Sequence, residues 1–76
     1  MKGTVMPNHT YKKIDLVGSS STSITDAVES AIARAHRTTR NLEWFEIEQV
    51  RGSIFEGKVA QYQVVMKVGF RIEDPS

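Results

Sequence analysis

The fold of this 76-residue chain turns on the stretch Leu42-Glu43-Trp44-Phe45-Glu46-Ile47-Glu48, which contains its only tryptophan. As a β-strand, this stretch sends successive side chains to opposite faces of a sheet. Phe45 and Ile47 then face the core, while Trp44 lies on the other face with two glutamates. An indole that points away from the core of a small protein needs a partner, which is another subunit or a flat ligand.

Two further stretches show the alternation that is typical of half-buried strands. In residues 11–17, Ile14 and Leu16 alternate with charged residues until Gly18 and a run of serines break the pattern. Near the end of the chain, apolar residues occupy every second position. The core face predicted for this last strand consists of Ala60, Tyr62, Val64, Met66, Val68, Phe70 and Ile72.

Between the first two strands, the apolar residues change to a helical period. Ser23 with Asp26 three residues later resembles a capping box with Asp in place of Glu, so we expect the helix to begin there. Asn41 is the expected C-terminal stop. The predicted buried stripe is Ile24, Ala27, Val28, Ala31, Ile32 and Ala35.

This order of elements predicts an α+β chain of the form β-α-β-β, with a three-stranded antiparallel sheet against one helix. Glu56-Gly57-Lys58 reads as the hairpin turn between the last two strands, and Gly52 indicates a bulge or bend. Residues 1–8 are expected to form a flexible tail and residues 9–76 a single domain. The long strands leave one face and two edges uncovered, so self-assembly is expected.

Composition argues against several classes of protein. Ten basic and nine acidic residues give a net charge of +1, which offers no field to attract nucleic acid or a membrane surface. No apolar run approaches the roughly 20 residues of a membrane span, and the N-terminus lacks the apolar region of a signal peptide. Without cysteine there is no disulfide or thiolate site, and two histidines are too few for a conventional zinc site. We expect a cytoplasmic protein without a metal centre.

The residues of an enzyme are also hard to find. The serines cluster before the helix without a nearby histidine, and Gly18 is a lone glycine rather than part of a phosphate-binding loop. Small tautomerases are built from similar short units, but their base is an N-terminal proline, whereas Pro7 is internal. A non-catalytic protein is therefore expected, with a small oligomeric enzyme as an alternative.

Trp44 and Gln63 are the most informative pair, because both are predicted on the face opposite the apolar stripe. The indole offers a stacking plane, and the amide offers one acceptor and two donors. A planar heterocycle with an amide-like edge would suit them. A subunit interface sealed by Trp44 explains the same pattern equally well, so the residues alone leave both interpretations open.

Three motifs in order resemble those of the dodecins, a family of small flavin-binding proteins, and the resemblance runs from about Tyr11 to Glu73. The motifs are Tyr11-Lys12-Lys13-Ile14-Asp15-Leu16-Val17-Gly18, Leu42-Glu43-Trp44-Phe45-Glu46 followed by Arg51-Gly52, and Tyr62-Gln63-Val64-Val65-Met66-Lys67-Val68-Gly69-Phe70-Arg71.

The resemblance implies a sheet that wraps its helix, and a hollow homododecamer of cubic symmetry. Dodecins bind flavins in stacked pairs at subunit junctions, each ring lying between its partner flavin and a tryptophan. By motif position the tryptophan is Trp44, and Gln63 reads the polar edge of the ring. Glu43 and Arg51 line the same site, although many members have Asp where this chain has Glu43. Simple alternation points Arg51 at the core, so we expect a bulge at Arg51-Gly52 to turn it outward.

The resemblance also implies what the protein does. Stacked flavin (riboflavin, FMN or a related flavin) is quenched by the tryptophan, which suits storage, buffering or photoprotection without turnover. Some dodecins bind coenzyme A as well, through a basic surface. By motif position that surface would involve Thr10, Lys12, Arg34, Thr38, Thr39, Arg40, Arg71 and Glu73.

Overall fold

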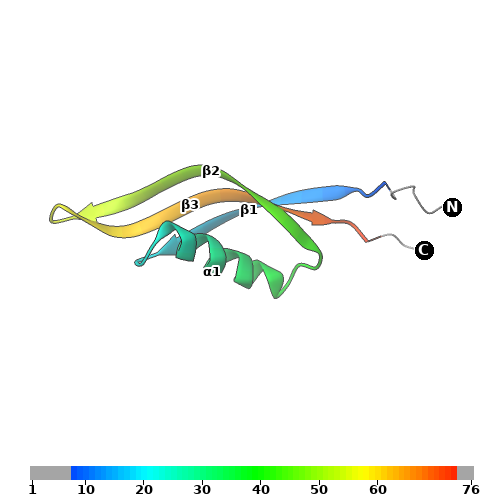
Figure 1. The fold of residues 1–76 in the computed structure, drawn as a ribbon, viewed down its shortest axis with the longest axis horizontal. Helices are drawn as coiled ribbons and strands as arrows, with labels where there is room; N and C mark the ends of the chain where they lie inside the picture. The colour runs from blue at the N-terminus through cyan, green and yellow to red at the C-terminus, as the bar shows by residue number, and fades with distance from the viewer. Residues whose placement is uncertain (1–7, 74–76) are drawn as a thin grey trace.

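A computed structural model describes residues 8–73, and the predicted tail lies outside these residues except for Asn8. The elements follow the predicted order β-α-β-β (Figure 1). All strand pairs are antiparallel, and β3 lies between β1 and β2 in the sheet. The predicted α+β architecture of three strands and one helix is confirmed. Its elements are β1 (Tyr11–Ser20), α1 (Ile24–His36), β2 (Leu42–Phe55) and β3 (Lys58–Arg71).

The helix begins where the sequence predicts. The Ser23 side chain accepts a hydrogen bond from the Asp26 backbone N–H at 3.0 Å. The Ser20 hydroxyl donates to the Asp26 carboxylate at 2.7 Å, which fastens the end of β1 to the first helical turn. The helix ends at His36, five residues before the predicted stop. Asn41 does adopt a positive φ of 65°, but in the connection to β2.

The core lies between α1 and the middle of the sheet. It consists of Ala27, Val28 and Ala35 from the helix with Val64, Met66 and Val68 from β3. Helix α1 lies close to β1 because Gly18 has no side chain. A Cβ at this position would overlap the backbone carbonyl of Ala27. Gly18 thus belongs to β1 and does not end it, contrary to the sequence-based expectation.

The helix covers only part of the predicted core face. Thirteen helical residues span about 20 Å, whereas the fourteen residues of β3 span about 46 Å. Ala60 lies beyond the helix and is exposed. On β2, Phe45 and Ile47 are 47% and 46% exposed, because they line a groove beside α1 instead of a closed core.

The far end of the β2–β3 hairpin projects beyond β1 as a two-stranded arm, residues 53–61, visible at the left of Figure 1. Its turn is the Glu56-Gly57 pair, both with positive φ, as a two-residue hairpin loop requires. Lys58, which the sequence placed in the turn, is the first residue of β3 and pairs with Phe55. Ile54 and Phe55 in this arm are 78% and 68% exposed. The chain is accordingly elongated, 63 × 22 × 15 Å.

A bulge in β2 determines which way Arg51 points. Ile47 pairs with Met66 and Gln49 with Val65, so Glu48 is an extra residue without a partner. After it the alternation is reversed, and Arg51 pairs with Gln63 on the face away from the helix. The prediction that a bulge turns Arg51 outward is right, but the position Arg51-Gly52 is wrong, since the register runs unbroken through those two residues.

Within residues 8–73, no helix has the length and apolar character needed to cross a membrane.

Gly18→Ala tests the close contact between β1 and α1. The added Cβ would overlap the Ala27 carbonyl, so helix and strand must separate. We expect a loss of about 1–3 kcal/mol in the free energy of unfolding, measured by denaturant titration at one protein concentration. Ser19→Ala, at the exposed neighbouring position, is the control and should change it little. An unchanged Gly18→Ala protein would contradict the contact.

Candidate functional site

Trp44 is held on the sheet face away from the helix, as predicted. It pairs with Gly69 of β3, and its indole lies over that glycine, where a Cβ would overlap the ring. The ring of Tyr11 meets the indole edge-on, at 5.2 Å between centroids and an interplanar angle of 72°. The half-buried indole is therefore in contact with Gly69 on one side and with the ring of Tyr11 on another.

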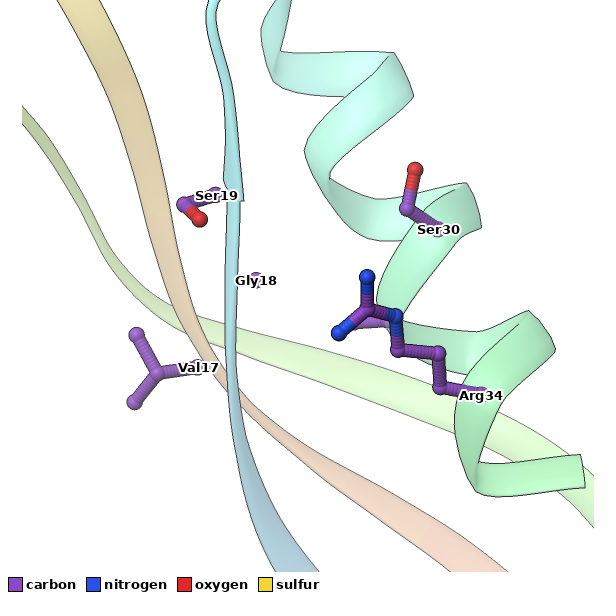
Figure 2. Close-up of a pocket in the computed structure, with 6 residues that line it drawn as sticks. Val17, Gly18, Ser19, Ser30 and Arg34 are labelled. Atoms are coloured by element: carbon purple, nitrogen blue, oxygen red, sulfur yellow. The ribbon is translucent and has the colours of Figure 1, made fainter.

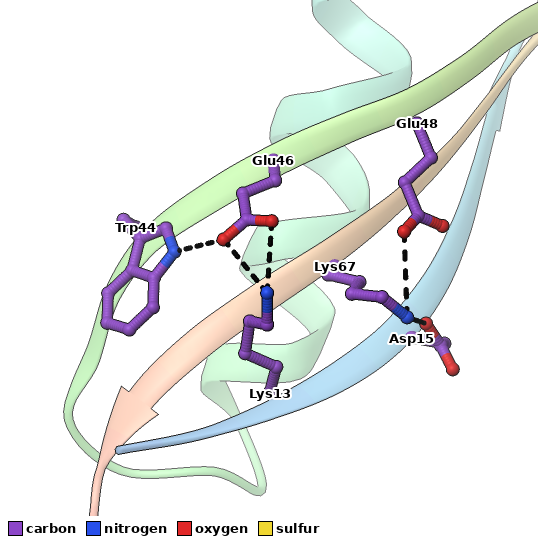
Figure 3. Close-up of polar contacts among 6 residues, drawn as sticks. All are labelled: Lys13, Asp15, Trp44, Glu46, Glu48 and Lys67. Atoms are coloured by element: carbon purple, nitrogen blue, oxygen red, sulfur yellow. Dashed lines mark hydrogen bonds and ion pairs between the residues drawn. The ribbon is translucent and has the colours of Figure 1, made fainter. Parts of the chain in front are cut away.

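The indole N–H is also fixed. Nε1 of Trp44 donates to Oε2 of Glu46 at 2.8 Å, and Lys13 Nζ donates to both oxygens of the same carboxylate at 3.1 and 3.2 Å (Figure 3). The pKa of Glu46 lies below its ordinary value, chiefly because the indole N–H and then Lys13 stabilise the charged form. Alternation along the strand places Glu46 on the same face as Trp44, but it does not show that the carboxylate binds the indole N–H.

A second charged cluster lies next along the same face. Lys67 Nζ contacts Asp15 at 2.6 Å and Glu48 at 3.6 Å (Figure 3). Its pKa is raised, mainly because Asp15 accepts a hydrogen bond from the charged ammonium and attracts it. These exposed ion pairs separate the Trp44 end of the face from the Gln63 end.

Gln63 and Arg51 form a pair at that other end. Arg51 Nε donates to the amide oxygen of Gln63 at 2.6 Å, across neighbouring strands. The two residues line a hollow with Gly52, Ser53 and Gln61. With its oxygen engaged by Arg51, Gln63 has its NH₂ group available as a donor, and Arg51 keeps its two terminal nitrogens available.

The predicted flavin residues do not form one site within a single chain. Glu43 adjoins Trp44 as a bulged residue between the paired positions 42 and 44. Arg51 and Gln63 meet each other. The two groups are far apart, however, because Gly69 and Gln63 are six residues apart on β3, about 20 Å along the strand.

The residues predicted for coenzyme A also fall into groups. Arg40 and Glu73 form an ion pair at 3.3 Å, and they line an open hollow at the end of the sheet with Thr38, Thr39 and Arg71. Thr10 adjoins this hollow, since its carbonyl accepts the Ile72 N–H at 2.8 Å.

Arg34 and Lys12 stand apart from that hollow. Arg34 lines a separate notch with Ser30 and Ala31 of α1 and with residues 17–19 of β1. Figure 2 shows the Arg34 guanidinium between α1 and β1, whereas the Ser19 side chain lies on the other side of the strand. Lys12 lies on β1, where it pairs with Phe70 of β3. Among residues 8–73, no group of three or more His, Cys, Asp or Glu side chains could hold a metal ion.

Comparison with known proteins gives a consistent result. The family model described as Dodecin matches residues 10–73. A curated dodecin from Thermus thermophilus is 50% identical over 64 residues, which are 84% of this chain and 93% of the relative. The structure of dodecin from Streptomyces coelicolor is 49% identical and superposes with a TM-score of 0.85, covering 91% of this chain and 99% of the other.

Variants of the Thermus protein have also been solved. One of them, in which a tryptophan is replaced by phenylalanine, is 46% identical with a TM-score of 0.84 and covers 88% of this chain and all of the other. The family model, the curated relative and the solved structures all indicate the same family. This chain is a member of the dodecin family.

Proposed function

We propose that this dodecin binds flavins in stacked pairs, with Trp44 as the wall of each binding site. The observation that carries the proposal is the fixed, half-buried indole on the outer sheet face, which rests on Gly69 and has its N–H held by Glu46. A flat aromatic ligand gains most from a ring that is already held in place, because less side-chain freedom is lost on binding. The isoalloxazine ring of riboflavin or FMN is such a ligand.

Gln63 and Arg51 would supply the polar recognition. With its amide oxygen held by Arg51, Gln63 directs its NH₂ group outward, where it can donate to a carbonyl on the polar edge of the ring. The remaining guanidinium nitrogens of Arg51 suit the phosphate of FMN, since arginine binds phosphate oxygens in a bidentate manner. Glu43, beside Trp44, is exposed and can accept from ligand hydroxyls.

The separation of the two groups supports a site that is shared between subunits. About 20 Å of sheet lies between the Trp44 end and the Gln63 end, so a neighbouring copy must bring the second group to the first. The protomer also exposes apolar residues on both the arm and the groove beside α1. Exposed apolar surface of this extent favours association, and we propose the hollow homododecamer of the family.

The proposed role is binding without catalysis. A tryptophan stacked on a flavin can donate an electron to its excited state and recover it quickly, which quenches fluorescence and limits photochemistry. This suits storage, buffering or photoprotection of free flavin, and the cytoplasm is the expected location. In the rival interpretations, Trp44 only seals a subunit interface, or the oligomer is a small enzyme.

We propose coenzyme A as a second ligand, at the hollow beside the end of the sheet. Thr38, Thr39, Arg40 and Arg71 line it and offer hydroxyl and guanidinium donors for phosphate groups. Phe70 and Ile72 add apolar surface. Arg34 lies in a different notch, so a coenzyme A molecule bound in the hollow would have to extend along α1 to reach it.

Trp44→Ala should abolish quenching of bound flavin and weaken flavin binding by about tenfold or more, because the stacking surface is lost. The measurement is a titration of riboflavin or FMN followed by flavin fluorescence, with one flavin per chain expected at the endpoint for the unmodified protein. Trp44→Phe is the matched control, and it should keep part of the affinity. The assembly should keep its mass in light scattering, and a Trp44→Ala protein that still quenches would contradict the stacking role.

Gln63→Ala should bind flavin about two- to tenfold more weakly, because one hydrogen-bonding partner is lost, while bound flavin stays quenched. Gln49→Ala, the same change at an exposed position of β2 that does not line this hollow, should bind normally. If each site takes Trp44 and Gln63 from different chains, oligomers reconstituted from Trp44→Ala and Gln63→Ala chains regain intact sites, about a quarter in a random equal mixture. If the mixed oligomers bind and quench flavin only as the average of the two variants does, both residues of a site come from the same chain.

A further inference from the structure

We infer that Glu46, held by Lys13, is a positioning residue that fixes the orientation of the Trp44 indole before flavin binds. The inference rests on the proposed flavin binding and adds to it a residue that touches the indole and not the ligand. Glu46 lies two positions after Trp44 on the same strand and the same face, so its carboxylate can reach the indole N–H without any change in the backbone.

The contacts of the indole restrain it in different directions. Gly69 lies beneath the ring and sets its height above the sheet. Tyr11 meets its edge from β1. Neither contact distinguishes the two orientations of the ring that differ by a flip about its Cβ–Cγ bond. The hydrogen bond from Nε1 to Glu46 does, because the indole has a single N–H donor and only one ring orientation directs it at the carboxylate.

Lys13 completes the arrangement from the opposite edge of the sheet. Its ammonium donates to both oxygens of Glu46, although β1 and β2 are separated by β3. The bridge crosses the sheet beside Gly69, the residue that pairs with both Lys13 and Trp44. A carboxylate restrained at both oxygens is a firmer acceptor than a free one on an exposed strand, because hydrogen bonds to charged groups are the stronger ones.

A restrained indole should favour a flat ligand. A free tryptophan side chain would have to give up its alternative rotamers when a flavin stacks on it, and ordering of one such side chain weakens binding by about three- to tenfold. In this structure the indole is already restrained without a ligand. Glu46 therefore acts on affinity through Trp44, and its loss should leave the stacking surface itself intact.

Glu48 is a natural control for this effect. It is a glutamate on the same strand, two residues further on, and its carboxylate contacts Lys67 at 3.6 Å instead of the indole. The substitutions Glu46→Ala and Glu48→Ala remove the same group and the same charge from one sheet face. Only the first removes the hydrogen bond to Trp44.

The experiment uses the tryptophan fluorescence of the protein, excited at wavelengths that tyrosine does not absorb, which reports on Trp44 alone because the chain has one tryptophan. Time-resolved anisotropy without flavin should show a larger fast component for Glu46→Ala than for the unmodified protein. Glu48→Ala should match the unmodified protein, and Glu46→Gln, which keeps an acceptor oxygen, should lie between. With flavin, Glu46→Ala should bind about three- to tenfold more weakly and still quench at saturation.

The outcomes separate this inference from the proposed function. If Glu46→Ala shows the anisotropy decay of the unmodified protein, Glu46 does not position the indole, whatever the flavin result. If the decay changes as expected but the unmodified protein does not bind flavin, the positioning stands and the proposed function fails. A Glu48→Ala protein that changes as much as Glu46→Ala would also overturn the inference, since the effect would then come from charge.

The dependence on pH gives a second readout. The groups that face Glu46 are Lys13 from β1, Lys67 from β3 and Trp44 on its own strand, while Asp15 and Glu48 lie on the far side of Lys67. The donors lower the pKa of Glu46, so the restrained indole should persist through neutral and mildly acidic pH.

As the pH falls through this lowered pKa, Glu46 is protonated and the bridge to Lys13 is lost. Tryptophan emission and anisotropy should therefore change only below the ordinary range of a glutamate. The transition should be absent in Glu46→Gln and present in Glu48→Gln. A transition that survives in Glu46→Gln would belong to another group and would contradict the role of Glu46.

Discussion

Helix α1 is less than half as long as β3, the central strand it packs against, and the surface of this protomer follows from that mismatch. About 20 Å of helix can cover only the middle of a sheet whose longest strands reach about 46 Å. The buried core is consequently short, from Val64 to Val68 on β3. Beyond it lie the bare arm and the groove beside α1, whose apolar side chains have no cover within residues 8–73.

The opposite face carries the candidate site because no helix covers it. There the side chains are arranged by cross-strand neighbours alone: an indole over a glycine, two groups of ion pairs, and an arginine on a glutamine amide. Each group is local, and the hollow beside Arg51 and Gln63 is separate from the indole. Under the proposed function, this face is one wall of a binding site, and the apolar surfaces on the other side can hold a second copy that completes it.

The sequence predicted what depends on local periodicity. The helix start at Ser23 and the outward direction of Trp44 and Gln63 follow from spacing alone, and the structure agrees. Spacing could not locate the bulge, because the extra residue at Glu48 depends on pairing with β3. It also missed Glu46, since alternation tells which face a side chain occupies but not which neighbour it binds. The extent of the core was overestimated for a similar reason: a strand pattern does not reveal how far a helix reaches.

The bulge at Glu48 has a consequence for how this strand can change by insertion or deletion. An unpaired residue in a strand shifts the alternation by one position, so each side chain after it points to the sheet face that its neighbour would otherwise occupy. Removing this one residue would leave the sequence beyond it intact yet exchange its two sides, turning Val50 outward and Arg51 toward the helix. Trp44, which precedes the shift, would keep its place. A single codon between Trp44 and Arg51 therefore sets whether these two side chains are displayed on the same side of the sheet.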